Sequence, residues 1–165
     1  VPSAAQTGAW TDGEILVRGP IIMKGYFNQP EETAKVIDAE GWFHTGDMGF
    51  LDEEGFLTIS GRLKEMLIVS GENVYPREIE AVLEQHPAVL QAAVIGVADE
   101  SRGEVPVAFV LCAEGKEVTE AELRRFARQS LGGFKVPRQI HVAHELPVGP
   151  AGKILKRKLR ELLDA

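Results

Sequence analysis

Three side chains in this sequence are of types that could bind a diol, a phosphate or another anion: Asp47, Arg62 and Lys153. Asp47 follows Thr45-Gly46 on a predicted tight turn, where a carboxylate can accept hydrogen bonds from both hydroxyls of a vicinal diol such as a ribose. Arg62 can share that diol or approach a phosphate. Lys153 ends a loop rich in glycine and proline, so its amine is predicted to be exposed.

Each of these side chains also has an ordinary structural role as an alternative. Asp47 fits a turn-forming cap, Arg62 a surface ion pair and Lys153 a solvated lysine. For Asp47 and for Lys153, each taken singly, this structural role is the commoner case. The surrounding segments are therefore needed to distinguish a ligand-binding role from a structural role for these three residues.

The segment Gly61–Glu80 is predicted to join two structural units. Within it, an apolar run at Met66–Val69 and a turn rich in Gly and Asn at Ser70–Asn73 predict a β-hairpin. Pro76 is predicted to be the first residue of a helix, because its missing N–H has no partner there in any case and its φ is already helical. The start of the segment, with Arg62 and Lys64, then lies at the junction.

The elements on the two sides of this junction differ in kind. Before it, strands are predicted at residues 14–18 and 56–60, with a short helix at 31–37 whose first turn is acidic. After it, strands at 91–97, 105–112 and 139–142 alternate with helices, one of which opens with the capping box Thr119-Glu120-Ala121-Glu122. The predicted class is α+β: a strand-rich subdomain followed by a short sheet packed by helices.

Composition excludes several classes of protein. With 165 residues, 44% of them hydrophobic, the chain can bury one ordinary core or two small ones. Its formal charge of −7 argues against a general nucleic-acid binder. Cys112 is the only cysteine, which excludes an internal disulfide framework and a thiolate zinc cluster. His141 and His144 are predicted to point to opposite faces of a strand, so no metal site is expected.

Four motifs occur together in a specific order and spacing. They are Gly46-Asp47, the stretch Gly61–Glu80, Phe134–Pro137 and Gly152-Lys153. In this arrangement the chain closely resembles the C-terminal part of an acyl-CoA synthetase, one of the adenylate-forming enzymes that also include luciferases and the adenylation domains of peptide synthetases. The resemblance covers nearly everything from residue 14 to residue 163.

The resemblance implies an AMP-forming acid–thiol ligase. In such enzymes a carboxylic acid, here expected to be a fatty acid, attacks the α-phosphate of Mg-ATP to give an acyl-adenylate and pyrophosphate. A thiol, usually coenzyme A, then displaces AMP. The implied cofactors are ATP, Mg2+ and coenzyme A.

The resemblance also assigns roles to individual residues. Asp47 would hold the ribose hydroxyls together with Arg62, and Ile59 would lie near the nucleotide. Lys153 would be the adenylation lysine. Lys64 would be the hinge about which the C-terminal domain rotates between half-reactions. Ser70, Gly71 and Glu72 would form a coenzyme A-binding turn, which this rotation would bring to the active site.

The expected domains follow from the same resemblance. Residues 1–63 would be the last, strand-rich subdomain of a large N-terminal adenylation domain, with residues 1–13 as a linker, and residues 64–165 a mobile lid domain. No glycine-rich phosphate loop for ATP occurs in the sequence. The chain is therefore expected to be a fragment that is inactive without the missing N-terminal domain.

Other interpretations stay open. A non-catalytic lid or carrier-protein-docking module is the main alternative, and an anion-surface or nucleic-acid binder acting through the basic C-terminal helix is a third. No apolar run approaches a transmembrane segment. The expected location is the cytoplasm, with a peripheral position at the membrane as a second option, and a homo-oligomer remains an option for the assembly.

Overall fold

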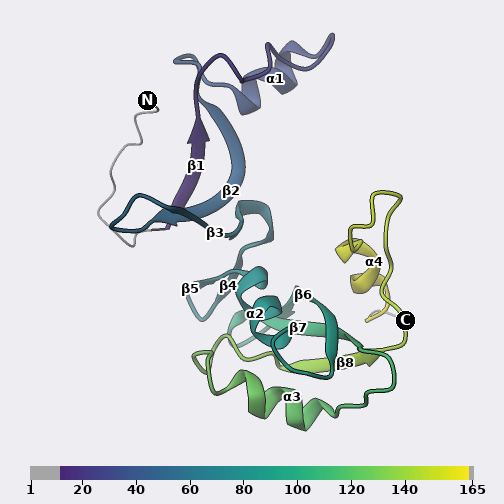
Figure 1. The fold of residues 1–165 in the computed structure, drawn as a ribbon. Coiled ribbons are helices and arrows are strands. Elements are labelled where there is room, and N and C mark those ends of the chain that lie inside the picture. The colour runs from purple at the N-terminus through teal and green to yellow at the C-terminus, as the bar shows by residue number, and fades with distance from the viewer. Residues whose placement is uncertain (1–11, 164–165) are drawn as a thin grey trace. The chain divides into compact units, whose positions relative to one another are not determined.

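The computed structural model describes residues 12–163, which belong to two compact units. Of these residues, 12–64 form unit 1 and 65–163 form unit 2 (Figure 1). The predicted linker, residues 1–13, lies almost entirely outside the described residues, and Gly13 already begins strand β1 (Gly13–Val17). Among the described residues, no helix has both the length and the apolar character needed to cross a membrane.

Unit 1 is built on a three-stranded antiparallel sheet in the order β1-β2-β3, where β2 is Phe43–Leu51 and β3 is Leu57–Arg62. Helix α1 (Pro30–Val36) precedes β2 and carries two acidic residues in its first turn. Proline and acidic side chains both suit a helix start, so the sequence signals here predicted the element correctly.

Asp47 does not lie on the tight turn predicted from Thr45-Gly46-Asp47. It is an interior residue of β2, which pairs with β1 along one edge and β3 along the other. Gly46 has a φ of +69°, in the left-handed region that favours glycine. This glycine therefore introduces an irregularity within the strand and does not end it, which is why the sequence pattern looked like a turn.

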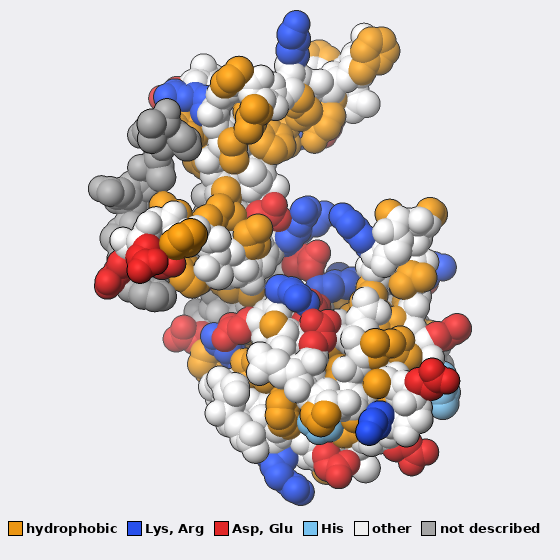
Figure 2. Space-filling model, viewed as in Figure 1, with side chains coloured by type: hydrophobic (Ala, Val, Ile, Leu, Met, Phe, Trp, Pro, Cys, Tyr) orange, Lys and Arg blue, Asp and Glu red, His pale blue; other side chains and the backbone are white. Residues whose placement is uncertain are grey.

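Large apolar side chains are exposed on unit 1. Met48 is the one large apolar side chain of residues 12–64 that is buried. Figure 2 shows hydrophobic side chains over the elements of this unit. A single sheet with one short helix has no second layer to cover such side chains, and the most exposed of them are Ile21, Phe27, Phe56 and Ile59.

Unit 2 contains a five-stranded sheet, with four strands in the order β5-β4-β7-β6 and β8 paired in parallel with β7. Its strands are β4 (Leu67–Val69), β5 (Glu72–Val74), β6 (Val89–Asp99), β7 (Gly103–Cys112) and β8 (Gln139–Ala143). A short 3-10 helix, η1 (Leu63–Glu65), precedes them, and the helices are α2 (Pro76–Leu83), α3 (Glu120–Ala127) and α4 (Lys156–Glu161).

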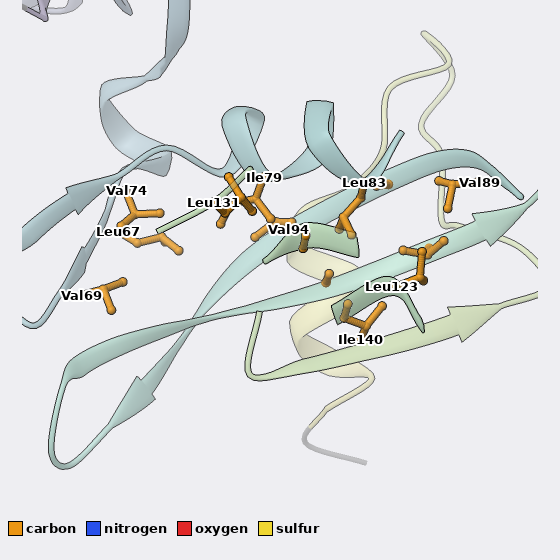
Figure 3. Close-up of a cluster of buried hydrophobic side chains, with 14 residues drawn as sticks. Leu67, Val69, Val74, Ile79, Leu83, Val89, Val94, Leu123, Leu131 and Ile140 are labelled. Carbon is orange, nitrogen blue, oxygen red and sulfur yellow. The ribbon is translucent and has the colours of Figure 1, made fainter. Parts of the chain in front are cut away.

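The core of unit 2 has two apolar layers, one on each face of the sheet. Successive side chains of a strand point to opposite faces, and β6 follows this rule: Ala92 and Val94 enter one layer, Ala93 and Ile95 the other. In the first layer, Figure 3 shows Ile79 beside Val94. Helices α2 and α3 supply that layer, whereas α4 contributes to the second.

The local signals of α3 appear in the structure as predicted. The Thr119 hydroxyl accepts a hydrogen bond from the Glu122 N–H at 3.3 Å, and the Glu122 carboxylate accepts one from the Thr119 N–H at 2.9 Å. This is the reciprocal capping box. The hairpin of β4 and β5 and the helix start at Pro76 are also confirmed, and with them the α+β class.

The C-terminal helix is present where its leucines indicate it, but it buries little. Of Leu155, Leu159 and Leu162, only Leu159 is fully buried, and Leu162 is exposed. Helix α4 has six residues, so it is too short to present a long stripe to the sheet. Its position rests on Leu159 and on the charged contacts of its first residue.

Candidate nucleotide and thiol site

Asp47 and Arg62 are brought together in unit 1. They are directly opposite each other on β2 and β3, and Arg62 Nε lies 2.8 Å from Asp47 Oδ1. The two side chains are 27% and 49% exposed, respectively, so both are accessible to a ligand. The contact uses one of five guanidinium N–H donors and one of two carboxylate oxygens, which leaves further hydrogen-bonding capacity on both groups.

A network of hydrogen bonds from β1 holds the strand around Asp47. The Thr45 hydroxyl donates to Ile15 O at 2.8 Å and accepts from the Asp47 N–H at 3.0 Å. The Gly46 N–H donates to Glu14 Oε1 at 3.1 Å. Through these contacts β1 fixes the backbone on which Asp47 stands.

His44 completes this network, and no role was predicted for it. Its Nδ1 lies 2.9 Å from Glu14 Oε2, and its Nε2 lies 3.8 Å from Asp38 Oδ2. The hydrogen bond with Glu14 is the main reason why the pKa of His44 is raised above its ordinary value, against a smaller opposing effect of desolvation. A protonated His44 is therefore favoured beside two carboxylates.

Ile59 lies on β3 opposite Gly49, and its side chain is 60% exposed. A side chain on Gly49 would have its Cβ 2.5 Å from Thr58 O, so glycine is needed for the close approach of these strands. Ile59 thus presents an accessible apolar surface on the same strand as Arg62.

Lys153 is exposed on a closed loop of unit 2. Although the loop is rich in glycine and proline, it is not irregular throughout, because Val148 and Ile154 form an antiparallel bridge. The Gly149 N–H donates to Lys153 O at 2.8 Å. Backbone bonds therefore hold the Lys153 backbone, while the amine is exposed to solvent.

The predicted hinge is the last residue of unit 1, and the predicted turn lies near the beginning of unit 2. Lys64 is exposed within η1, at the boundary between the two units. Ser70 and Gly71 form the two-residue turn between β4 and β5, with φ of +54° and +86°. Positive φ at both central residues defines a type I′ hairpin turn, in which glycine is favoured.

An arginine-lined cavity of about 280 Å³ lies in unit 2, and sequence reasoning missed it. Arg124 and Arg128 line it four residues apart, a spacing that places them on one face of a helix and was the available signal. The Arg124 Nε is buried and finds no hydrogen-bond partner among the described residues. The remaining arginines of the lining are Arg102 and Arg138.

This cavity adjoins the Ser70 turn through a backbone hydrogen bond. The Ser70 N–H donates to Arg102 O at 2.8 Å. A residue of the predicted thiol-binding turn is therefore hydrogen-bonded to a residue that lines the cavity, and both belong to unit 2. Within residues 12–163, no group of three or more His, Cys, Asp or Glu side chains could hold a metal ion.

Residues 78–153 match the family model of the AMP-binding enzyme C-terminal domain. The chain is 46% identical to a 2-succinylbenzoate–CoA ligase of Bacillus cytotoxicus over 93% of its own length and 31% of the relative's. It is 49% identical to a long-chain-fatty-acid–CoA ligase of Bacillus subtilis, over 90% of the chain and 26% of the relative.

A solved structure agrees with these relatives. The o-succinylbenzoate CoA synthetase of Bacillus subtilis, in complex with its acyl-adenylate intermediate, superposes with a TM-score of 0.86 at 38% identity, over 93% of this chain and 31% of that one. The chain thus spans about a third of the length of these proteins.

Proposed function

Since this chain belongs to the AMP-binding, adenylate-forming enzymes and corresponds to their C-terminal part, we propose that the protein containing it is an AMP-forming acid–thiol ligase. Its reaction would join a carboxylic acid to coenzyme A in two steps, through an acyl-adenylate. The observation that carries this proposal is the accessible Asp47–Arg62 pair.

The pair suits the ribose and phosphate of a nucleotide. Asp47 Oδ2 can accept from a ribose hydroxyl while Oδ1 accepts from Arg62, and the remaining guanidinium donors can reach a second hydroxyl or a phosphate oxygen. Ile59 offers an exposed apolar surface that suits the nucleoside. These residues would bind and orient the nucleotide, and none of them needs to transfer a proton.

Lys153 supplies the positive charge for the first step. The acid and the triphosphate are both anionic, so their approach is opposed by charge repulsion. One cation at about 4 Å contributes roughly 4 kcal/mol at an effective dielectric constant near 20. Positioned charge of this kind is most of what a protein offers to phosphoryl chemistry.

The two units would have separate duties. Residues 1–63 would complete the large nucleotide-binding domain, and residues 64–165 would form a lid that rotates about Lys64. The apolar side chains exposed on unit 1 support this assignment, because side chains of that size are usually covered by more protein.

The second step would use the Ser70-Gly71 turn, the adjoining Glu72 at the start of β5, and the arginine-lined cavity. Coenzyme A carries several phosphates, and the four arginines around the cavity match that charge. A Cβ atom added at Gly71 would meet no atom within 4 Å outside its chain neighbours, so this backbone is open to a narrow pantetheine arm. Mg2+ would arrive bound to ATP.

We propose a fatty acid as the acid, with 2-succinylbenzoate as the competing substrate. A fatty acid is the acid expected from the sequence, and relatives named for either acid match the chain at similar identity. A panel of acids assayed by pyrophosphate release with the whole protein separates the two.

The decisive experiment is Lys153→Ala in the whole protein, assayed in each half-reaction. The rate of acyl-adenylate formation, measured by ATP–pyrophosphate exchange, should fall by about 100-fold or more. Thioester formation from supplied acyl-adenylate should remain largely intact. The control is Lys158→Ala, which removes another exposed amine nearby on α4.

Two outcomes would contradict the proposal. Equal loss of both half-reactions in Lys153→Ala would remove the lysine from its role. A folded whole protein without pyrophosphate exchange for any acid would favour the non-catalytic lid or carrier-docking module.

A further inference from the structure

Three charged side chains from distant parts of unit 2 meet at one point. Lys156 Nζ lies 2.8 Å from Glu80 Oε1 and 2.6 Å from Glu65 Oε2. Lys156 is the first residue of α4, Glu80 lies in α2 and Glu65 ends η1. One ammonium group therefore connects three elements.

Glu80 is the buried member of this cluster. Its side chain is 9% exposed, and its Oε1 also accepts a hydrogen bond from the Val94 N–H at 2.9 Å. Among the described residues, Lys156 is the one cation within ion-pair distance of this carboxylate. A buried charge is retained only when it is paired, so Glu80 fixes the position of Lys156 strongly.

Lys156 also stands at the end of the Lys153 loop. Immediately before it, the Leu155 N–H donates to Pro147 O at 2.7 Å, which closes the loop at its base. Lys153 precedes Lys156 by three residues. The ion pairs therefore anchor the end of the loop from which the Lys153 amine extends.

The other carboxylate of the cluster belongs to the hinge region. Glu65 directly follows Lys64 and lies in the same 3-10 turn. The ammonium that anchors the Lys153 loop thus also contacts the residue next to the proposed pivot. Both contacts lie within unit 2.

We propose that Lys156 is a positioning residue for acyl-adenylate formation: it fastens the Lys153 loop to α2 and to the hinge-side end of unit 2, so that the lysine turns with the lid as one rigid body. This inference rests on the proposed function. Lys156 touches neither substrate; it acts by holding Lys153 in place. The Ser70–Glu72 turn is held by β4 and β5, so the second half-reaction does not need this anchor.

The test compares Lys156→Met, Lys156→Arg and Arg157→Met in the whole protein. Lys156→Met should lower kcat for adenylation by between about tenfold and 100-fold, the loss expected for a misplaced catalytic group. The KM for ATP and thioester formation from supplied acyl-adenylate should stay within about twofold of wild type, because only the lysine loop is loosened. Lys156→Arg should restore most of the activity.

Arg157→Met is the matched control, because Arg157 is the next residue and its side chain is 88% exposed. It should behave as wild type in both half-reactions. The combined variant Lys156→Met with Glu80→Gln removes the buried unpaired carboxylate. It should recover stability but not adenylation, which separates positioning from folding.

Amide hydrogen exchange gives a second reading in the same proteins. The amide hydrogens of Gly149 and Leu155, whose hydrogen bonds close the loop, should exchange faster in Lys156→Met than in the wild type. In Arg157→Met they should exchange at the wild-type rate. Amides of β6 and β7 should keep their protection in the combined variant.

Lys153→Ala, assayed alongside, distinguishes the possible failures. If it still forms acyl-adenylate at the wild-type rate, the role of Lys153 fails and this inference with it, whereas a wild-type protein that forms no acyl-adenylate with any acid overturns the proposed function itself. If Lys153→Ala is inactive while Lys156→Met is normal, the positioning role alone is overturned. Equal loss of both half-reactions in Lys156→Met, or recovery of adenylation in the combined variant, also overturns it.

Discussion

Arg62 is the cross-strand neighbour of Asp47, and its Nε lies 2.8 Å from the Asp47 carboxylate. Neighbouring strands thus hold a carboxylate and a guanidinium in register. The pair is accessible to solvent, so its purpose is not to stabilise the sheet strongly.

Replacing either member should weaken ATP binding more than folding. Asp47→Asn and Arg62→Met should each raise the KM for ATP by about tenfold or more, because each removes a charge-assisted hydrogen bond. The free energy of unfolding should change by less than about 1 kcal/mol. Lys35→Met, which breaks an exposed ion pair on α1, is the control for charge loss. An unchanged KM for ATP in both variants would exclude a role in nucleotide binding.

The Ser70-Gly71 turn gives a prediction for the second half-reaction. Gly71→Asn keeps a residue that tolerates positive φ but adds bulk where the glycine backbone is open. Thioester formation should fall by about tenfold or more while adenylation is retained, since binding energy is lost only for coenzyme A. Stopped-flow assays of the two half-reactions measure this.

Gly115→Asn is the matched control, because Gly115 also has a positive φ and open surroundings. It should leave both half-reactions unchanged. Normal thioester kinetics in Gly71→Asn would show that coenzyme A does not pass this turn.

The Glu80–Lys156 pair should dominate the electrostatic stability of unit 2. Lys156→Met leaves a buried carboxylate unpaired and should cost roughly 3 kcal/mol, whereas the variant that also carries Glu80→Gln should recover much of this. A double-mutant cycle measured by urea unfolding should give a coupling energy of roughly 1–3 kcal/mol. A coupling energy near zero would mean that Lys156 is not paired in solution.

His44 should make the stability of unit 1 depend on pH. Its hydrogen bond with Glu14 raises the folded-state pKa above the ordinary value of 6.5. The stabilisation is therefore fully present below pH 6.5 and is lost as the pH rises through the folded pKa. In Glu14→Gln, the midpoint of urea unfolding should no longer show this dependence on pH.

An NMR titration of the His44 ring checks the same point directly. Its pKa should lie above 6.5 in the wild type and fall in Glu14→Gln. His141→Gln, a change in unit 2, should leave the titration of His44 as it is. A His44 pKa at or below 6.5 in the wild type would contradict the contact.

The sequence predicted those features that depend on residues close together in the chain. The capping box needs Thr119 and Glu122, three residues apart, and the hairpin needs a two-residue turn between short apolar strands. The helix start at Pro76 is equally local. Such signals act through the backbone conformation of a few residues, so they can be read without knowing the fold.

Tertiary structure decided where those elements place their side chains. Gly46 looked like part of a turn, but pairing with two neighbouring strands keeps Asp47 inside β2. Lys156 looked like one more cation of a basic helix, yet it meets Glu65 across 91 positions of the chain. Long-range pairing depends on which surfaces the packed layers bring together, and no local pattern in the sequence records that.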